Sequence, residues 1–377
     1  MGKLDILIKD INKQYKEDIA ARGIALIMTQ KIPFSSPRAN YMLYGGLPRG
    51  RIIEFAGEEN GGKTTTALDI VANAQPLFIK EWEDEIRELE SSDKLKKDAQ
   101  TRLDYLKSRG PKQVVYADCE NTLDEEWAKN IGVDTDKMIV IKPQSQTAEQ
   151  IFEMILQMIE TDEVGLIVID SLGVMLSAQA YEKTMEEKTY GGIAAALTLF
   201  SKKAELACSK YNCTLIGINQ MRENMNSPYG GMITTGGKGW KHNCSIRLMF
   251  QKGAYIDERG NEIKRSADSP AGNLVMINIA KTKVCKPDRR VGFYTLNYYT
   301  GIDQVADMIE VAMKYGIIQQ AGAWFNFIDI DTGEIITDEE GETLKIQGKP
   351  NLTDFLKTNT SLYDEISKKV ESLIASK

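Results

Sequence analysis

Histidine is almost missing from this sequence, since His242 is the only one among 377 residues. Zinc sites and catalytic mechanisms that need several histidines are therefore poorly supported. The five cysteines are odd in number and form no CxxC pair, which indicates reduced, buried thiols rather than a disulfide framework. The sequence also lacks a run of eighteen apolar residues, and its N-terminus lacks the apolar core of a signal peptide. We expect a cytoplasmic protein that makes no membrane contact.

An excess of positive charge is missing as well, because the formal net charge is −7. Such a balance at first argues against a nucleic-acid partner. The acidity is uneven, however: residues 303–377 hold fourteen acidic and seven basic side chains, and the rest of the chain is balanced. Basic loops on the balanced part can still bind phosphate groups.

The N-terminal part predicts a helix, a short strand and a turn-rich segment ahead of the first buried strand. Apolar residues recur at helical spacing over residues 4–19, and residues 23–28 are typical of a strand. Residues 33–50 are rich in turn formers. An apolar strand at 51–56 and a helix over about 63–73 follow.

Residues 79–109 predict a charged helical hairpin. Apolar residues repeat every three or four positions in each half, and Ser91-Ser92-Asp93 lies between the halves. The first half is acidic and the second is basic. A solvated insertion with no role explains the same pattern equally well.

The middle of the chain predicts an α/β fold with a mostly parallel central sheet. Its strands are apolar without polar alternation and are separated by helices, which is typical of a sheet covered on both faces. Beyond Gly301 the pattern turns helical around one Gly- and Asp-rich turn, which predicts a separate small α/β domain. The predicted strands are 113–118, 166–170, 214–219, 245–250, 274–281 and 292–298, and the predicted helices are 151–159 and 193–210.

A phosphate-binding loop is the most specific motif, because GxxxxGK[ST] is matched in full between a strand and a helix. In such a loop, backbone N–H groups face the phosphates, Lys63 reaches the β- and γ-phosphates, and the Thr64 hydroxyl holds Mg²⁺. Asp170 ends a later buried strand, where the outer carboxylate of the metal is found. The motif consists of Gly57, Glu58, Glu59, Asn60, Gly61, Gly62, Lys63 and Thr64.

Three further positions carry weaker signals, each with a structural alternative. Glu120 follows a third strand and could polarise a water molecule, or it could cap a turn. Trp127 could stack on a base or pack in the core. Lys281 and Lys283 are two apart on a strand and point to one face, so they need a nearby anion unless that edge is solvated.

The chain resembles the bacterial RecA recombinase family and its phage relatives. The matching segments run in the order of that family over most of the chain, and helicases of the same core fold do not share the later ones. The segments are 46–52, 62–65, 118–124 (Asp-Cys-Glu-Asn-Thr-Leu-Asp), 168–171, 218–222 (Ile-Asn-Gln-Met-Arg), 234–237, 281–283 (Lys-Thr-Lys) and 321–324 (Ala-Gly-Ala-Trp).

The resemblance implies roles around the nucleotide. Glu120 matches the catalytic glutamate of the family, and Gln220 matches the glutamine that senses the γ-phosphate. Trp127 falls where an aromatic stacks on adenine, with Asp124 near the base. Lys281 and Lys283 match the pair that reaches the γ-phosphate of a neighbouring subunit. The matching segments also extend the nucleotide site to Thr65 and Ser171.

The resemblance also implies two DNA-binding loops, at about 179–192 and 221–235. It implies three parts of the chain: an oligomerisation segment at 1–32, a RecA-type P-loop ATPase core at 33–302 that carries the 79–109 insertion, and a C-terminal α/β domain at 303–377. The DNA contacts are then expected at Lys183, Lys188, Arg222, Thr234, Thr235, Gly236, Gly237, Lys238 and Lys241.

The implied function is ATP- and Mg²⁺-dependent homologous recombination and DNA repair. A helical homo-oligomer would form on single-stranded DNA and pair it with a homologous duplex, with accessory recombination proteins as possible partners. A ring-forming, helicase-like motor and a DNA-coating protein that uses ATP only structurally are the alternatives. Two departures from the family stand out, Ala194–Ala196 in place of an arginine and the acidic C-terminal domain.

Overall fold

The computed structural model describes residues 3–15, 30–91, 97–184, 192–223, 232–264, 266–337 and 343–375. The chain forms two compact units, Met1–Gln30 and Lys31–Lys377. In the first unit, α1 (Lys3–Tyr15) is an amphipathic helix with Asp5 in its first turn and Lys13 in its last, charges that suit the helix dipole. This helix agrees with the sequence prediction as far as Tyr15. The strand predicted at 23–28 lies outside the described residues.

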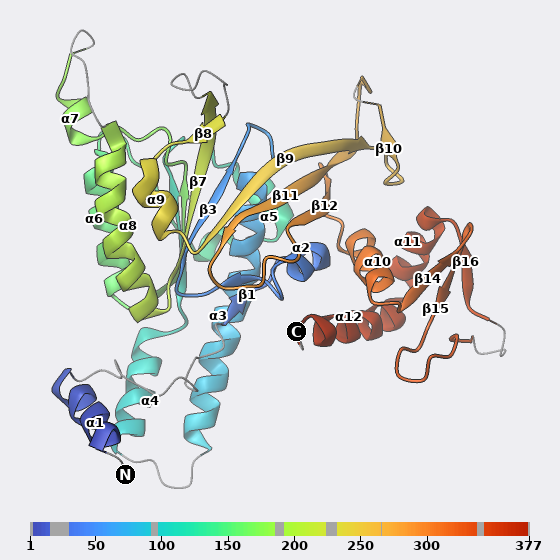
Figure 1. Cartoon of the computed structure of the whole chain (residues 1–377), viewed down its shortest axis with the longest axis horizontal. Coiled ribbons are helices and arrows are strands. Elements are labelled where there is room, and N and C mark those ends of the chain that lie inside the picture. The colour runs from blue at the N-terminus through green and yellow to red at the C-terminus, as the bar shows by residue number, and fades with distance from the viewer. Residues whose placement is uncertain are drawn as a thin grey trace. The chain divides into compact units, whose positions relative to one another are not determined.

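The second unit contains one large, mostly parallel sheet, which confirms the predicted fold class (Figure 1). The strand order is β13-β12-β11-β9-β3-β7-β6-β4-β5. All pairings from β9 to β5 are parallel, whereas β11, β12 and β13 pair antiparallel. The strands are β3 (Ile52–Gly57), β4 (Gln113–Asp118), β5 (Met138–Ile141), β6 (Val164–Asp170), β7 (Thr214–Glu223), β9 (Ile246–Ile256), β11 (Gly272–Thr282), β12 (Val291–Asn297) and β13 (Gly301–Ile302).

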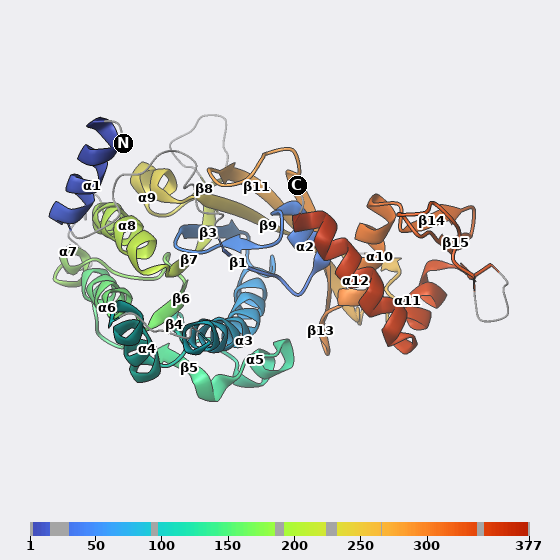
Figure 2. The same ribbon diagram turned by 90° about the horizontal axis from the view of Figure 1, so that it is seen from below.

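Helices cover both faces of the parallel part (Figure 2). Alternate residues of one strand enter opposite cores: Tyr116 of β4 packs under α3 and α5, and Val115 packs under α6 and α8. Because both faces are buried, these strands are apolar throughout. The helices are α3 (Lys63–Glu90), α5 (Glu125–Ile131), α6 (Ala148–Glu160), α8 (Gly192–Tyr211) and α9 (Gly237–Asn243).

Several short elements complete this unit. A small ribbon pairs β1 (Lys31–Ile32) with β2 (Leu47–Pro48), and α2 (Pro37–Met42) lies between them in sequence. Two further short strands lengthen the main sheet where β10 (Glu262–Ile263) pairs with β9 and β8 (Met232–Thr234) pairs with β7. The remaining pieces are α7 (Ala178–Tyr181) and the 3₁₀ turn Thr135–Lys137.

The charged insertion forms a hairpin, but its first helix is not separate from the helix that follows the phosphate loop. We expected that helix to end near Asn73, whereas α3 continues through Pro76 to Glu90. Packing on both sides of Pro76 offsets the lost hydrogen bond: the Gln75 amide bonds the backbone of Asp134, and Phe78 lies under the Arg49 guanidinium. The second helix is α4 (Lys97–Arg109).

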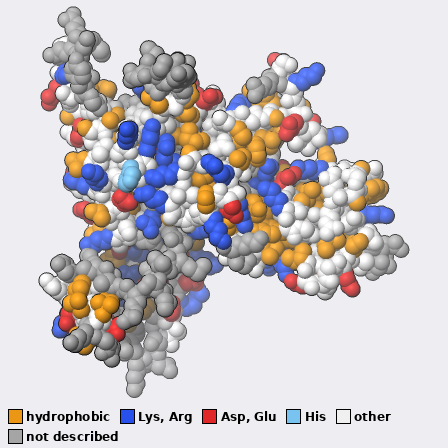
Figure 3. Space-filling view, in the orientation of Figure 1, with side chains coloured by type: hydrophobic (Ala, Val, Ile, Leu, Met, Phe, Trp, Pro, Cys, Tyr) orange, Lys and Arg blue, Asp and Glu red, His pale blue; other side chains and the backbone are white. Residues whose placement is uncertain are grey.

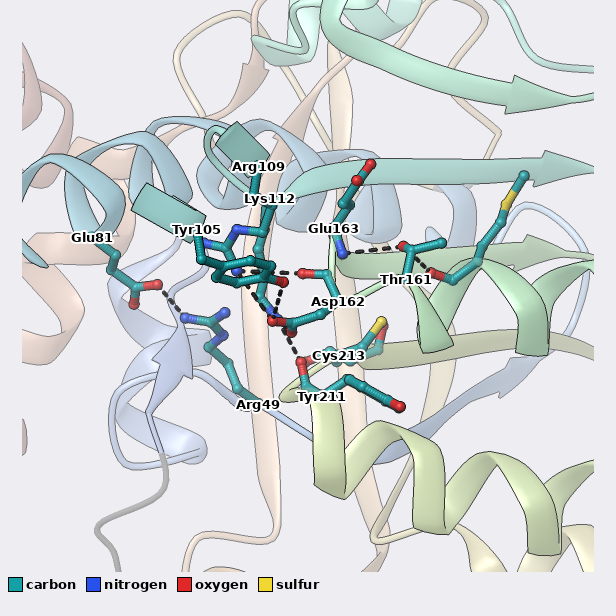
Figure 4. A network of polar contacts seen from close by, with 12 residues as sticks. Arg49, Glu81, Tyr105, Arg109, Lys112, Thr161, Asp162, Glu163, Tyr211 and Cys213 are labelled. Atoms are coloured by element: carbon teal, nitrogen blue, oxygen red, sulfur yellow. Dashed lines mark hydrogen bonds and ion pairs between the residues drawn. The ribbon is translucent and has the colours of Figure 1, made fainter. Parts of the chain in front are cut away.

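The base of this hairpin is bound to the core by polar contacts (Figure 4). Arg49, which lies ahead of β3, pairs with Glu81 of α3. The Tyr105 hydroxyl of α4 donates to Asp162 at 2.8 Å, and Lys112, which follows α4, donates to the same carboxylate at 2.7 Å. The two helices are held together by the buried side chains of Leu103 and Leu106. The Trp82 indole of α3 adds a hydrogen bond to the Leu106 carbonyl of α4. The hairpin is therefore a fixed part of the fold.

The C-terminal residues have a core of their own, with Phe325, Phe327 and Leu352 buried in it. A three-stranded antiparallel sheet packs there against three helices. The elements are α10 (Gln304–Lys314), β14 (Ile318–Ala321), β15 (Trp324–Phe327), β16 (Lys345–Gln347), α11 (Lys349–Thr358) and α12 (Thr360–Ala375). No helix among the described residues combines the length and the apolar character that a bilayer crossing requires.

Candidate active site

The phosphate-binding loop joins the end of β3 to the start of α3, as its motif predicts. Two of its glycines are required by the backbone. Gly62 has φ of 92°, a conformation that favours glycine, and a Cβ on Gly57 would lie 2.2 Å from the Phe250 carbonyl oxygen. Glu58, Glu59, Asn60 and Gly61 form the loop between them. The free N–H groups at the start of α3 make this loop a phosphate cradle.

Lys63 lies inside the loop that precedes it. Its ammonium group donates to the carbonyl oxygens of Gly57, at 3.1 Å, and Glu58. Burial lowers the pKa of this ammonium, and the nearby carboxylates of Asp170 and Glu120 act in the opposite direction. The lysine is thus held at the point where the phosphate-binding motif needs a positive charge.

Thr64 and Asp170 meet beside the loop, although they are far apart in the sequence. The Thr64 hydroxyl donates to one Asp170 carboxylate oxygen at 2.8 Å, and the Tyr116 hydroxyl donates to the same oxygen at 2.7 Å. Burial raises the pKa of the Asp170 carboxyl, and these two hydrogen bonds partly offset that rise. Among the described residues no group of three or more His, Cys, Asp or Glu side chains is placed to hold a metal. Thr64 and Asp170 could hold Mg²⁺, which takes few oxygens from a protein when phosphates provide others.

Glu120 and Gln220 are also brought together at this edge of the sheet. The Gln220 amide donates to the Glu120 carboxylate at 3.1 Å, and the Ser171 hydroxyl donates to the same oxygen. Parallel pairing explains the meeting, because Asp118 pairs with Asp170 and Gly57 pairs with Gln220. The ends of β4, β6, β7 and β3 therefore deliver their side chains to one place.

A pocket of about 480 Å³ opens beside the loop. Trp127 lines it, and its indole N–H donates to the Thr65 hydroxyl at 3.4 Å. Stacking of Trp127 on the adenine base stays a prediction. Asp124 is the N-cap of α5 and accepts from the backbone N–H of Trp127 at 3.0 Å. The pocket is also lined by residues that the sequence analysis did not select: Lys252, Tyr255, Pro270, Asn273, Leu296 and Tyr298.

Four of these six missed residues are polar. The Lys252 ammonium lies 4.4 Å from the centre of the Tyr255 ring, and the Tyr298 hydroxyl donates to the Asn273 side chain at 2.7 Å. They come from β9, β11 and β12 and from the positions just before β11 and just after β12, and the antiparallel pairing of these strands is long-range. No local motif marks such residues, and only the alternation of their strands could have indicated that they share a face.

The second predicted DNA loop begins later than expected. Residues 214–219 were predicted as a strand, but β7 continues to Glu223 and pairs with β8, so Arg222 and Thr234 lie on a two-stranded ribbon. The Arg222 guanidinium donates to the Gly173 carbonyl at 3.1 Å, and Thr234 is buried. Thr235 follows the ribbon, and its carbonyl accepts from Asn219 at 2.9 Å. Residues 224–231 lie outside the described residues.

The remaining predicted DNA-binding residues lie on α9 and in the first loop. Gly236 and Gly237 have φ of 97° and 65° and begin α9 rather than extending a loop, and Lys238 and Lys241 lie on this helix. In the first loop Lys183 is described, and Lys188 lies outside the described residues.

Lys281 and Lys283 contact α8 and α9 rather than the phosphate loop. The Lys281 ammonium donates to the carbonyls of Lys241 and His242 at 2.7 and 2.6 Å, and Lys283 lies 3.7 Å from the Glu205 carboxylate. Burial, and then the neighbouring charge of Lys283, lower the pKa of Lys281. Lys and Arg side chains gather on the surface around the single histidine (Figure 3). Lys281 lies beside that histidine, and Lys283 is close enough for its charge to act on Lys281.

The fold and this site define a P-loop ATPase in which a strand-end glutamate meets a glutamine that leads into a β-ribbon. Sequence comparison identifies the group. Residues 3–78 and 85–303 match the RecA N-terminal domain, and residues 306–375 match the RecA C-terminal domain. The chain belongs to the RecA family. Residues 79–84, which the first match skips, lie in the first helix of the hairpin.

Curated relatives support the same assignment. Protein RecA of Acidothermus cellulolyticus is 33% identical over 328 residues, which cover 87% of this chain and 79% of the relative. Protein RecA of Nocardioides sp. is 31% identical over 371 residues, covering 97% and 90%. Protein RecA of Malacoplasma penetrans is 29% identical over 368 residues, covering 97% and 94%. These matches confirm the predicted recombinase function with its DNA-dependent ATPase activity, and they do not favour the ring-forming motor.

Proposed function

We propose that this RecA-family protein forms a helical filament on single-stranded DNA, with ATP and Mg²⁺ bound between subunits, and pairs that strand with a homologous duplex. The observation that carries the proposal is the hydrogen bond between Gln220 and Glu120. Gln220 lies on the strand that leads into the predicted DNA loop, and Glu120 lies beside the phosphate loop. A ligand at either place therefore acts on the same pair.

The bound nucleotide would be held mainly by groups already in place. Lys63, now bonded to loop carbonyls, would turn to the β- and γ-phosphates, and Thr64 and Asp170 would hold Mg²⁺. The metal would offset charge on the phosphates. Glu120 would accept a proton from the attacking water, because the bonds from Ser171 and Gln220 both go to one of its two carboxylate oxygens.

The second half of each site would come from the next subunit. Lys281 and Lys283 bond to α8 and α9, and both belong to a basic surface. Two lysines on such a surface fit charge stabilisation on a neighbour's γ-phosphate, which arginine fingers provide in other P-loop enzymes. In the same contact, the segment 1–30 would dock on the neighbour. Ile139 and Val140 of β5, the last strand in the sheet order, are well exposed and offer it an apolar edge.

DNA would be held through its backbone by Arg222, Lys183, Lys238 and Lys241, while base pairing reads the sequence. Negative-stain microscopy with single-stranded DNA and a non-hydrolysable ATP analogue tests the assembly, and strand exchange between circular single strands and a linear homologous duplex tests the activity. We expect helical filaments and exchange that needs ATP, with Lys63→Ala inactive in both. Closed rings, or exchange products that form equally without ATP, would contradict the proposal.

A further inference from the structure

A buried carboxylate lies at the centre of the contacts between the phosphate-loop strand and the DNA ribbon. Glu54, on β3 and three residues ahead of Gly57, is fully buried. One of its oxygens accepts from the Asn219 amide at 2.9 Å and from the Trp240 indole N–H at 3.0 Å, and the other accepts from the Arg247 guanidinium. A buried charge is tolerated only when it is partnered in this way.

Two of the partners of Glu54 also contact the ribbon that β7 forms with β8. Asn219 directly precedes Gln220 on β7, and its amide also donates to the Thr235 carbonyl at 2.9 Å. Arg247 of β9 reaches the Thr234 hydroxyl at 3.4 Å. Asn219 and Arg247 therefore connect Glu54 to the return arm of the DNA ribbon.

Trp240 connects the same carboxylate to the basic surface. It is fully buried on α9, and the last carbonyls of this helix, from Lys241 and His242, accept from Lys281. Its indole packs against β7, because a Cβ added at Gly217 would lie 2.6 Å from the ring. The helix therefore cannot shift along β7 without breaking its bond to Glu54 or colliding with the strand.

We propose that Glu54 is a positioning residue that couples the nucleotide site to DNA affinity. The inference rests on the function proposed for Gln220 and Lys281. When the γ-phosphate displaces Gln220, the movement of β7 relative to β3 changes the bond between Asn219 and Glu54. Thr234, Thr235 and α9 follow, because they share this carboxylate through Arg247, Asn219 and Trp240. Glu54 touches no substrate and acts only through these partners.

The test is the ratio of DNA dissociation constants measured with ADP and with a non-hydrolysable ATP analogue, using fluorescent single-stranded DNA. Trp240→Phe removes one donor and leaves the bonds of Glu54 to Arg247 and Asn219 in place. Glu54→Gln removes the charge. Because allosteric coupling in proteins is typically about 5- to 150-fold, we expect the ratio to fall by roughly fivefold or more in both variants. Affinity for the analogue without DNA should change by less than about twofold.

Phe152→Leu is the matched control. Phe152 of α6 stacks on Phe200 of α8 at 4.3 Å and is not one of the three donors to Glu54, so its replacement lowers the thermal midpoint while those three hydrogen bonds remain. The control should keep the parent's ratio. An unchanged ratio in Trp240→Phe, at any thermal midpoint, would overturn the inference, and so would an equal fall in Phe152→Leu. Should Glu54→Gln not fold, Trp240→Phe decides the question.

Failure of the proposed function has a different signature. It is a parent protein whose DNA affinity is the same with ADP and with the ATP analogue, so that no coupling exists to be lost. If the DNA affinity of the parent depends on the nucleotide and the variants keep the parent's ratio of dissociation constants, only the role of Glu54 is excluded.

Discussion

Replacing Glu120 with glutamine separates catalysis from binding at this site. One Glu120 oxygen accepts from Gln220 and from Ser171, and a glutamine amide retains an acceptor oxygen with the same reach. The two hydrogen bonds and the fold should therefore survive, while the amide cannot take a proton from water. Loss of general-base catalysis costs about 10² to 10⁴ in rate, which is about 2.7 to 5.4 kcal/mol in the activation free energy.

The assay is single-turnover phosphate release with saturating single-stranded DNA, beside binding of ATP and DNA measured by fluorescence. We expect Glu120→Gln to bind both ligands with nearly the parent's affinity and to release phosphate at least about a hundredfold more slowly. Glu125→Gln is the control, since this glutamate is exposed and pairs with Lys129 on its own helix. Half of the parent's rate in Glu120→Gln would show that the carboxylate is structural.

Three further predictions address the DNA link, the phosphate contacts and the C-terminal docking. Gln220→Ala should bind ATP nearly as well as the parent but lose stimulation by single-stranded DNA, and normal DNA-dependent turnover would refute that link. DNA affinity should fall steeply with salt despite the net charge of −7, so a log–log slope near zero would exclude backbone binding. Asp307 of α10 is fully buried and accepts hydrogen bonds from Ser36 and Thr295, which precede the C-terminal residues. Burial raises its pKa from 3.8 to about 7, so the stability that it contributes is complete below pH about 4 and is lost as the pH rises through 7. Asp307→Asn stays neutral, and its thermal midpoint should vary less than the parent's between pH 4 and 8; parallel curves would contradict this assignment.

Much of the core could be predicted because its signals are local. The phosphate-loop motif, the strand that ends in Asp170 and the apolar strands each lie in a few consecutive residues. Parallel topology then brings their ends together, so the meeting of Thr64 with Asp170 follows from the pattern. The site roles of Glu120 and Gln220 depended on the family resemblance, and their contact adds a geometric reason.

What the sequence did not reveal depends on long-range packing. The continuation of α3 past Pro76 requires Phe78 and Gln75 to be held by distant residues, which local propensity does not indicate. The pocket wall with Lys252 and Tyr298 requires the antiparallel register of β9, β11 and β12. Glu54 lies inside an apolar strand, and its burial is explained only by three donors that are distant in the sequence.

The central claim is that each ATP site is built from two subunits. Lys63→Ala removes the phosphate-loop half, and Lys281→Ala/Lys283→Ala removes the half supplied by the neighbour. Each variant alone should be nearly inactive, because every interface in its filament lacks one half.

The most direct measurement is DNA-stimulated phosphate release from mixtures of these two variants across mixing ratios, with co-assembly verified separately. Some interfaces then join an intact Lys63 to intact Lys281 and Lys283. In a head-to-tail array with random mixing at equal amounts, about a quarter of the interfaces would be complete, and activity should return in proportion. A flat baseline from variants that do co-assemble would mean that the lysines act within their own chain or not at all.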